Sequence, residues 1–356
     1  MLQESVPDER VQAAVAHWAP RFVTQGVDPN DFARVTATVR SWDEWLPAWV
    51  ADGHRHARLA QEAEEQGRTL TAGEAWNRAA LAYHFAKFVW LVDMDLYHEA
   101  LRLSVAALQN AHRLLDPTAE RLEIPCGELV MAATLRRPDG VSRAPLALLL
   151  PGLDSTKEEF YEWENVFLRR GLATLSLDGP GQGETGVSSA LTHAYEVPVA
   201  AALDFLAGRD DVDADRVGVV GVSLGGYYAP RAAAFEPRLR AAAGVSGPYR
   251  FASAWDTIPK PTKEMIRNRT RAADDDEARE RAALLDLAGV AERIEQPLLV
   301  VTGMLDRLVP WEDTKRIADE APNSTWVLYE DGNHVCNNLP YRYRPLVADW
   351  LSEQLR

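Results

Sequence analysis

The spacing of hydrophobic residues divides the chain into two parts. Up to about residue 115, apolar side chains recur at helical intervals, as at Leu81, Phe85 and Phe88. Strand patterns are absent there, and Pro and Gly are sparse between Thr71 and Leu115. Residues 1–115 are therefore predicted to form five or six helices.

Beyond Asp116-Pro117 the pattern becomes one of strands that alternate with helices. Leu122–Leu135 predicts two strands joined near Gly127. Further runs have the composition of buried parallel strands, namely Leu146–Leu150, Leu172–Leu177, Val217–Val220, Ala241–Val245 and Leu298–Val301. Helical stretches lie between them, at Lys157–Arg170, Val197–Ala207 and Leu224–Phe235. This alternation predicts an α/β fold with a mostly parallel, doubly wound sheet over residues 116–356.

Two features of this pattern leave alternatives open. The charged, helical segment Lys260–Ala283 interrupts the alternation and is either a lid helix or a solvated surface helix. The first third of the chain also contains six of the 11 tryptophans, which predicts either a Trp-rich core or an aromatic wall for a ligand. These tryptophans are Trp18, Trp42, Trp45, Trp49, Trp76 and Trp90.

A serine between two glycines lies at a predicted strand-to-helix junction. Gly221-Val-Ser-Leu-Gly225 matches the G-x-S-x-G pattern, with the buried strand Arg216–Val220 before it and an Ala-rich helix after it. The glycines permit a tight turn that exposes the hydroxyl, and the start of a helix favours negative charge on a substrate oxygen. Ser223 is therefore predicted to be a nucleophile, the alternative being an ordinary turn.

The residues that would assist Ser223 follow it in the chain. The order expected after such a turn is Ser, acid, His, and His334 is the only one of eight histidines beyond Ser223. It lies in a Gly-containing loop after the apolar strand Thr325–Tyr329, where the alternative is a solvated loop histidine. Asp306 ends the preceding strand and is predicted to orient His334, unless it only caps the following helix. Asp331 competes for this role but is only three residues from His334.

An oxyanion hole requires two backbone N–H donors. Leu224, directly after the nucleophile, is predicted to supply one. The other is assigned to Leu153 in the loop after the first central strand, with Asp154 as the alternative. The segment Asp178-Gly-Pro-Gly-Gln-Gly183 has glycines like a phosphate-binding loop, but it lacks the Lys and Ser/Thr of a P-loop, which favours a structural turn.

Composition narrows the class of protein. Lys and Arg number 38 against 53 Asp and Glu, and the net charge of −15 disfavours nucleic acids and anionic membranes as partners. No apolar run approaches the ~18 residues of a membrane span, and Met1–Ser5 lacks a signal-peptide pattern, so a cytoplasmic protein is expected. Cys126 and Cys336 are expected to be reduced thiols. No Cys/His cluster has zinc spacing, so no metal is expected.

These motifs resemble those of the α/β-hydrolase superfamily over roughly residues 117–356. The resemblance lies in Asp178–Glu184, Gly221–Gly226, Gly303–Asp306 and Gly332–His334. Within the superfamily, the chain resembles the branch that contains 2,6-dihydroxypseudooxynicotine hydrolase and fungal polyketide-shortening hydrolases. That likeness rests on Pro151–Glu158, Ser223–Tyr228, Glu236–Leu239 and Asp331–Asn338. A helical cap ahead of the hydrolase domain is typical of this branch, which implies a cap at 1–115 and a catalytic domain at 116–356.

The resemblance also implies an activity. The branch hydrolyses a C–C bond beside a ketone in aromatic or polyketide substrates, which implies Ser223, Asp306 and His334 as a catalytic triad that forms an acyl-enzyme. A small molecule is then the partner, no cofactor is required, and a homodimer is compatible with the resemblance.

Candidate recognition residues lie in both parts of the chain. Tyr83, His84 and Lys87 fall on neighbouring faces of one predicted helical turn and could bind phenolic or carbonyl oxygens. Asp256, beside Trp255, is a further candidate, and Asp154 is the candidate in the loop after the first central strand. For each of them, packing or capping is the alternative.

Three other functions fit parts of the same pattern. A carboxylesterase or thioesterase would use the same triad. A non-hydrolytic biosynthetic cyclase or dehydratase would give a product of unchanged mass or one lighter by water. A binding module of this fold would bind a small molecule without turnover, although an intact triad argues against that function.

Overall fold

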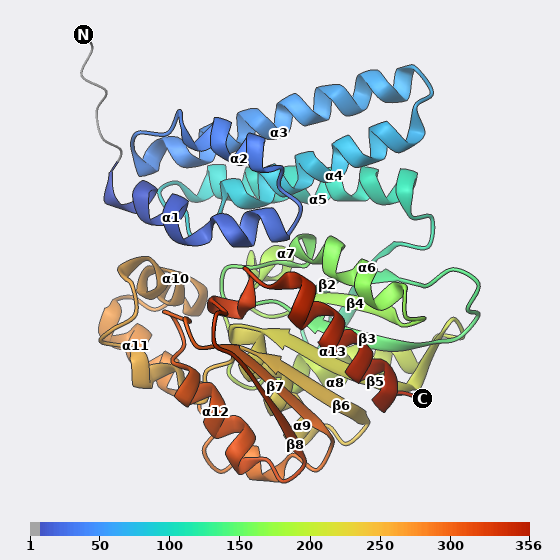
Figure 1. Cartoon of the computed structure of the whole chain (residues 1–356), viewed down its shortest axis with the longest axis vertical. Helices are drawn as coiled ribbons and strands as arrows, with labels where there is room; N and C mark the ends of the chain where they lie inside the picture. The colour runs from blue at the N-terminus through green and yellow to red at the C-terminus, as the bar shows by residue number, and fades with distance from the viewer. Residues whose placement is uncertain (1–7) are drawn as a thin grey trace. The chain divides into compact units, whose positions relative to one another are not determined.

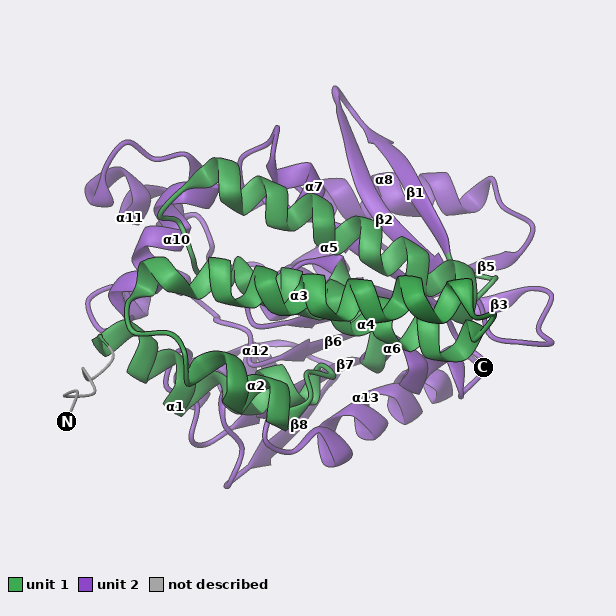
Figure 2. Ribbon diagram, turned by 90° about the horizontal axis from the view of Figure 1, so that it is seen from above, with its two compact units in different colours: residues 1–119, 158–162 green, residues 120–157, 163–356 purple. Residues whose placement is uncertain are grey.

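The computed structural model describes residues 8–356, which form two compact units (Figure 2). The helical unit contains the described residues up to Ala119 together with Glu158–Glu162. The sheet unit contains Glu120–Lys157 and Trp163–Arg356. Met1–Ser5, which carry the expectation about a signal peptide, lie outside the described residues.

Five α-helices make up most of the helical unit, in agreement with the predicted number (Figure 1). They are α1 (Glu9–Thr24), α2 (Pro29–Thr36), α3 (Trp42–Glu65), α4 (Thr69–Ala86) and α5 (Met94–Leu115). Aspartates begin three of them: the carboxylates of Asp8, Asp28 and Asp93 accept hydrogen bonds from backbone N–H groups of the first turn. Each carboxylate thereby satisfies a donor that the helix itself leaves unpaired.

Aromatic side chains form the core of the helical unit. Phe22 stacks on Phe85 with ring centroids 3.8 Å apart, and Trp45 and Trp49 pack around it. The indole N–H of Trp45 donates to the carbonyl of Phe85 at 3.0 Å, which satisfies its polar atom inside the core. Of the six tryptophans, four are buried in this core, namely Trp42, Trp45, Trp49 and Trp90. For these four, the structure has the Trp-rich core and not the exposed aromatic wall.

The sheet unit is built on one eight-stranded sheet of order β1-β2-β4-β3-β5-β6-β7-β8. The hairpin strands β1 and β2 are antiparallel to their neighbours and the other strands pair in parallel. The strands are β1 (Glu120–Cys126), β2 (Leu129–Arg136), β3 (Ala144–Leu150), β4 (Ala173–Asp178), β5 (Val212–Val222), β6 (Leu239–Val245), β7 (Leu298–Gly303) and β8 (Ser324–Tyr329). The predicted strands and the mostly parallel, doubly wound arrangement are confirmed.

Helices follow the strands in the sheet unit. The short helix η1 (Lys157–Phe160) and α6 (Tyr161–Leu168) include the residues that pass between the two units along the chain. The others are α7 (Gly183–Gly186), α8 (Glu196–Ala207), α9 (Leu224–Phe235), η2 (Phe251–Ala254), α10 (Lys260–Thr270), α11 (Asp275–Ala283), η3 (Ala291–Arg293), α12 (Trp311–Glu320), η4 (His334–Cys336) and α13 (Pro340–Gln354). Within residues 8–356, no helix combines the length and the apolar composition needed to cross a bilayer.

The segment Lys260–Ala283 is two helices and not one. Arg271 has a left-handed backbone, with φ of 56°, and ends α10; Asp274 then caps α11 through a hydrogen bond from Glu277 N. Met265 and Ile266 are buried while most charged side chains of both helices remain accessible. The pair therefore has an apolar face packed on the protein and a solvated charged face.

Candidate active site

Three polar side chains lie close together at the carboxyl ends of three parallel strands. Ser223 follows β5, Asp306 follows β7 and His334 follows β8, all beyond the carboxyl ends of parallel strands. His334 Nε2 lies 2.9 Å from Ser223 Oγ, and His334 Nδ1 lies 2.8 Å from Asp306 Oδ2. A single imidazole thus bridges a hydroxyl and a carboxylate, which is the geometry of a nucleophile, a general base and the group that orients the base.

Ser223 occupies a strained turn between β5 and α9. Its φ of 55° and ψ of −119° are rare for a residue with a side chain, and a hydrogen bond from its N–H to Val245 O, 2.8 Å, holds it there. The flanking glycines are required by contact: a Cβ on Gly221 would lie 1.8 Å from Gly225 O, and one on Gly225 would lie 2.2 Å from Leu150 O. The G-x-S-x-G pattern therefore reflects backbone packing that projects the hydroxyl out of the sheet.

Asp306 contacts His334 and does not cap the following helix, because the N-cap residue of α12 is Pro310 and no side chain caps it. Its side chain is fully buried; Oδ2 faces His334 while Oδ1 accepts hydrogen bonds from Leu308 N at 2.9 Å and Val309 N at 3.0 Å. The same carboxylate thus fixes the loop after β7 and orients the imidazole. Asp331, the competing acid, is exposed and pairs with Arg342.

The loop that carries His334 is held by a buried hydroxyl, that of Ser246, which sequence reasoning did not identify. Val335 and Cys336 both have a left-handed backbone, with φ of 58° and 53°. Ser246 Oγ, fully buried beyond the end of β6, accepts a hydrogen bond from Val335 N at 3.0 Å and lies 3.2 Å from Thr302 Oγ1. The only sequence signal for Ser246 is its place after a predicted strand, which many residues share.

Cys336 lies beside the site but is not a competing nucleophile. Burial, with smaller contributions from Asp306 and Asp331, raises the pKa of its thiol to about 12. The thiol therefore stays protonated at neutral pH, and only the thiolate is strongly nucleophilic. Cys126 and Cys336 are both free, as predicted.

The two residues predicted to supply the oxyanion hole belong to α9 and to the bend after β3. Leu224 is the first residue of α9, so its N–H has no acceptor within the helix. Leu153 lies in a bend after β3, directly after Gly152, and Asp154 is partly buried in the same bend. A Cβ on Gly152 would lie 3.1 Å from Ser223 Cβ and 3.5 Å from Ser223 Oγ. The backbone of this bend therefore passes close to the serine hydroxyl.

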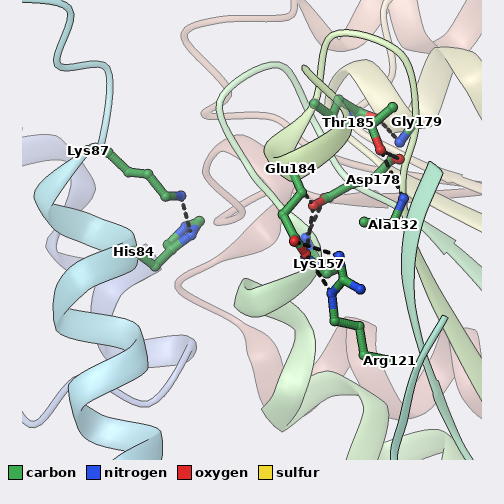
Figure 3. Close-up of polar contacts among 10 residues, drawn as sticks. His84, Lys87, Arg121, Ala132, Lys157, Asp178, Gly179, Glu184 and Thr185 are labelled. Atoms are coloured by element: carbon green, nitrogen blue, oxygen red, sulfur yellow. Dashed lines mark hydrogen bonds and ion pairs between the residues drawn. The ribbon is translucent and has the colours of Figure 1, made fainter. Parts of the chain in front are cut away.

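The glycine-rich segment after β4 is a structural turn. The buried carboxylate of Asp178 accepts hydrogen bonds from Lys157 N, Lys157 Nζ and Glu184 N at 2.8, 3.1 and 3.2 Å (Figure 3). A Cβ on Gly183 would lie 1.9 Å from Asp178 Oδ2. The protein's own carboxylate thus occupies the inside of the turn, where a phosphate-binding loop would hold its anion. Glu184 also pairs with Lys157 at 2.5 Å and with Arg121 at 2.8 Å.

The recognition candidates of the helical unit are buried and have partners within that unit. Tyr83 Oη lies 2.7 Å from His54 Nδ1, and burial raises the pKa of Tyr83 to about 12. His84 Nε2 lies 3.1 Å from Glu159 Oε2. Lys87 Nζ lies 3.0 Å from His84 Nδ1 (Figure 3). Their role in substrate binding stays a prediction.

Asp256 is placed differently from the other candidates. Its side chain is 79% exposed, on the turn after η2, and its carboxylate lies 3.4 Å from Arg279 on α11. A role in recognition stays a prediction for this residue as well.

One cluster in the helical unit has the residue types of a metal site. Asp31, Asp52 and His56 offer ligand atoms within 4.8 Å of one another. His56 Nε2 lies 2.8 Å from Asp31, and Arg34 lies 2.7 Å from Asp52. Ion pairing within the protein accounts for this cluster without a metal.

The sheet order, the strained serine between β5 and α9, and the imidazole that bridges it to an aspartate define an α/β-hydrolase. The family model described as "Esterase FrsA-like" matches residues 22–355, and the chain belongs to this family. It is therefore an enzyme of the hydrolase class.

Several known proteins are similar to the chain over its length or a large part of it. The 2,6-dihydropseudooxynicotine hydrolase of Paenarthrobacter nicotinovorans is 34% identical over 94% of this chain and 91% of its own. The crystal structure of the 2,6-dihydroxy-pseudo-oxynicotine hydrolase superposes with a TM-score of 0.87 over 94% of this chain and 95% of that one, at 32% identity. The 20-hydroxy-prefusarin hydrolase of Gibberella moniliformis is 32% identical over 63% of this chain, which spans only 57% of that relative.

Proposed function

We propose that the protein hydrolyses a C–C bond beside a ketone in a small aromatic or polyketide-like molecule, with Ser223 as nucleophile. The observation that carries this proposal is the continuous contact from Ser223 Oγ through the His334 imidazole to Asp306, at 2.9 and 2.8 Å. The names of the relatives, hydrolases of a pseudooxynicotine and of a prefusarin, support the substrate class.

The chemistry follows from the positions of these groups. His334 Nε2 accepts the Ser223 proton as Oγ attacks the ketone carbon, and Asp306 stabilises the imidazolium that forms. The N–H groups of Leu224 and Leu153 hold the negative oxygen of the tetrahedral intermediate. The C–C bond then breaks, and the imidazolium gives its proton to the departing carbon. Water attacks the remaining ester, with His334 again as base, and releases a carboxylic acid and free Ser223.

The substrate must stabilise the departing carbon. A carbanion is a far poorer leaving group than an alkoxide, so the electron pair has to spread into a second carbonyl or a phenol-like ring. A β-diketone or an acyl phenol meets this requirement, whereas a simple alkyl ketone does not. Each step uses a side chain, a backbone N–H or water.

A carboxylesterase or thioesterase is the second candidate, because the matching family model is described as an esterase. The two functions are separated by substrate. Benzoylacetone, an aryl β-diketone, should be split into a ketone and a carboxylate whose mass rises by two in H₂¹⁸O. Hydrolysis of 4-nitrophenyl acetate with benzoylacetone left intact would favour the esterase. A product of unchanged mass, or one lighter by water, would favour a cyclase or dehydratase.

The role of Ser223 is tested by Ser223→Ala with Ser188→Ala as a matched control. Loss of the nucleophile should lower kcat by several orders of magnitude, on the order of 10⁴ or more by analogy with other triads. Ser188 is exposed and lies after α7, so its alanine variant should keep the wild-type rate. Rapid-quench mass spectrometry should detect an acyl group on Ser223. A Ser223→Ala enzyme with a near-normal rate would remove this residue from the mechanism.

A further inference from the structure

The side-chain amide of Gln182 is buried between the glycine-rich turn and the bend after β3, and it is 1% exposed. Its Nε2 donates hydrogen bonds to two backbone carbonyls of that bend, Pro151 O at 2.7 Å and Gly152 O at 3.0 Å. Its Oε1 accepts hydrogen bonds from Gly179 N at 3.2 Å and from the Tyr195 hydroxyl at 2.5 Å. Both donors and both acceptor positions of the amide are therefore used.

These partners leave one orientation for the amide. The carbonyls of Pro151 and Gly152 can only accept, and the N–H of Gly179 can only donate. Nε2 must therefore face the bend and Oε1 must face the turn. A carboxylate of the same shape would place an oxygen against two carbonyl oxygens, which is repulsive.

The hydrogen bond to Gly152 O fixes the orientation of the whole peptide group between Gly152 and Leu153. The C=O of Gly152 and the N–H of Leu153 belong to one planar peptide group, which is trans, so the two bonds point in opposite directions. When Gln182 fixes the direction of the carbonyl, it also fixes the direction of the Leu153 N–H. Gly152 lies against Ser223, so the peptide group that carries this N–H is next to the nucleophile in the structure.

We propose that Gln182 is a positioning residue for the oxyanion hole, one that aims the Leu153 N–H through the Gly152 carbonyl. The inference rests on the proposed function, since it requires an oxyanion formed by attack of Ser223. Oxyanion donors act because they are already oriented before charge develops. Loss of the amide lets the Gly152–Leu153 peptide rotate, so transition-state stabilisation should fall while substrate binding is retained.

Two variants test this role, with a third as control. Gln182→Met keeps the length of the side chain and removes its hydrogen bonds, and Gln182→Glu replaces the donor by a carboxylate. Gln296→Met is the matched control, because Gln296 Nε2 also donates to a backbone carbonyl, Glu236 O, at the end of α9. The probes are 4-nitrophenyl acetate for turnover and phenyl trifluoromethyl ketone, whose adduct with serine carries an oxyanion.

We expect Gln182→Met to lower kcat by about tenfold to a hundredfold, somewhat less than complete loss of an oxyanion donor, with KM changed less than twofold. The affinity for the trifluoromethyl ketone should fall by the same factor as kcat/KM. Gln182→Glu should be more impaired at pH 8 than at pH 6, because the protonated carboxyl can still donate one hydrogen bond. Gln296→Met should match the wild type in kcat, in KM and in affinity for the trifluoromethyl ketone.

The outcomes separate this inference from the proposed function. If Ser223→Ala is inactive but both Gln182 variants keep wild-type kcat and inhibitor affinity, the positioning role is wrong and the proposed nucleophile stands. If Ser223→Ala keeps its rate, the proposed function fails and the inference fails with it. If Gln182→Met does not fold, the pH dependence of Gln182→Glu relative to wild type decides: a constant ratio overturns the inference.

Discussion

At the scale of single residues, replacement of the buried Asp306 carboxylate by an amide should impair catalysis while the fold around it is kept. In Asp306→Asn, the amide can keep the contacts of Oδ1 with the loop but can present an N–H to His334, which favours the wrong tautomer of the imidazole. We expect kcat to fall by a factor on the order of 10⁴, with the protein still folded. Steady-state hydrolysis of 4-nitrophenyl acetate at pH 7.5 measures the effect.

Asp331→Asn is the control for that change. Asp331 is exposed and pairs with Arg342 at 3.3 Å, and an exposed ion pair contributes at most about 1 kcal/mol to stability. The kcat of Asp331→Asn should therefore remain within about twofold of the wild-type value, because loss of such an exposed pair has little effect on the folded structure. If Asp331→Asn proved the more damaging of the two changes, the assignment of the acid would be reversed.

The sequence identified the residues of this site that carry a local signal, and missed those that act through the fold. Ser223 lies in a motif whose glycines have a packing reason, and His334 was selected by elimination. Ser246 carries no comparable signal, and Gln182 lies in the glycine-rich segment that supports the family resemblance, but nothing in that segment indicates its contact with Gly152. Gln182 contacts Gly152 only because β3 lies beside β4 in the sheet, although β3 and β4 are separated in the chain by η1 and α6. Such contacts depend on strand order, which hydrophobic patterning does not specify.

At the scale of elements, α3 and α4 pack so closely that one position of α3 has no room for a side chain. A Cβ on Gly53 would lie 2.4 Å from Cε1 of the Tyr83 ring on α4. In an isolated helix, a Gly→Ala substitution would stabilise the helical conformation by about 1 kcal/mol. Here the clash should dominate, and we expect Gly53→Ala to lower the free energy of unfolding by about 1–3 kcal/mol.

Urea unfolding followed by circular dichroism measures this effect, with Gly208→Ala as the control. Gly208 ends α8 with φ of −85°, and a Cβ there would lie 3.5 Å from Phe205 O, an ordinary contact. The control should change stability by less than about 0.5 kcal/mol, as surface substitutions usually do. A Gly53→Ala protein that is as stable as the control would mean that α3 and α4 can separate without cost.

Helices and strands with a clear hydrophobic pattern could be predicted from the sequence. A helix end that no Gly or Pro marks could not. The strands β3, β5 and β7 were visible as apolar runs because both faces of a central parallel strand are buried. The break between α10 and α11 falls at Arg271, whose left-handed backbone is uncommon for a residue with a side chain. Nothing in the residue type marks that turn.

At the scale of the whole molecule, a buried charge cluster in the helical unit links stability to pH. Glu159 comes from the segment Glu158–Glu162, and both of its carboxylate oxygens bind Arg21 on α1, at 2.6 and 2.7 Å. Burial alone would raise the pKa of Glu159, but Arg21 and His84 hold it well below its usual range. Glu159 therefore stabilises the folded state above its unfolded pKa, and this contribution decreases as the pH falls below that value toward the lower pKa of the folded state.

His84 responds at a milder pH. Burial is the largest cause that lowers its pKa, and Lys87 and Arg21 act in the same direction, against the opposing effect of Glu159. In the unfolded chain the imidazole has its ordinary pKa, so just below pH 6.5 the unfolded state binds more protons than the folded state. The free energy of unfolding therefore falls as the pH falls through that range.

We accordingly expect Tm to be constant from pH 8 to 7 and to decrease by about 1–2 °C for each kcal/mol lost as the pH falls from 6.5 to 5.5. Replacement of His84 by Gln removes its titration and should flatten this decrease. His193 is the matched control, because burial and then Arg231 lower its pKa as well, so it shifts stability in the same sense. In His193→Gln, the decrease of Tm that is due to His84 should remain. Differential scanning calorimetry at fixed ionic strength measures the profile. A His84→Gln protein whose Tm falls as steeply as that of wild type would show that the buried imidazole does not control the acid sensitivity.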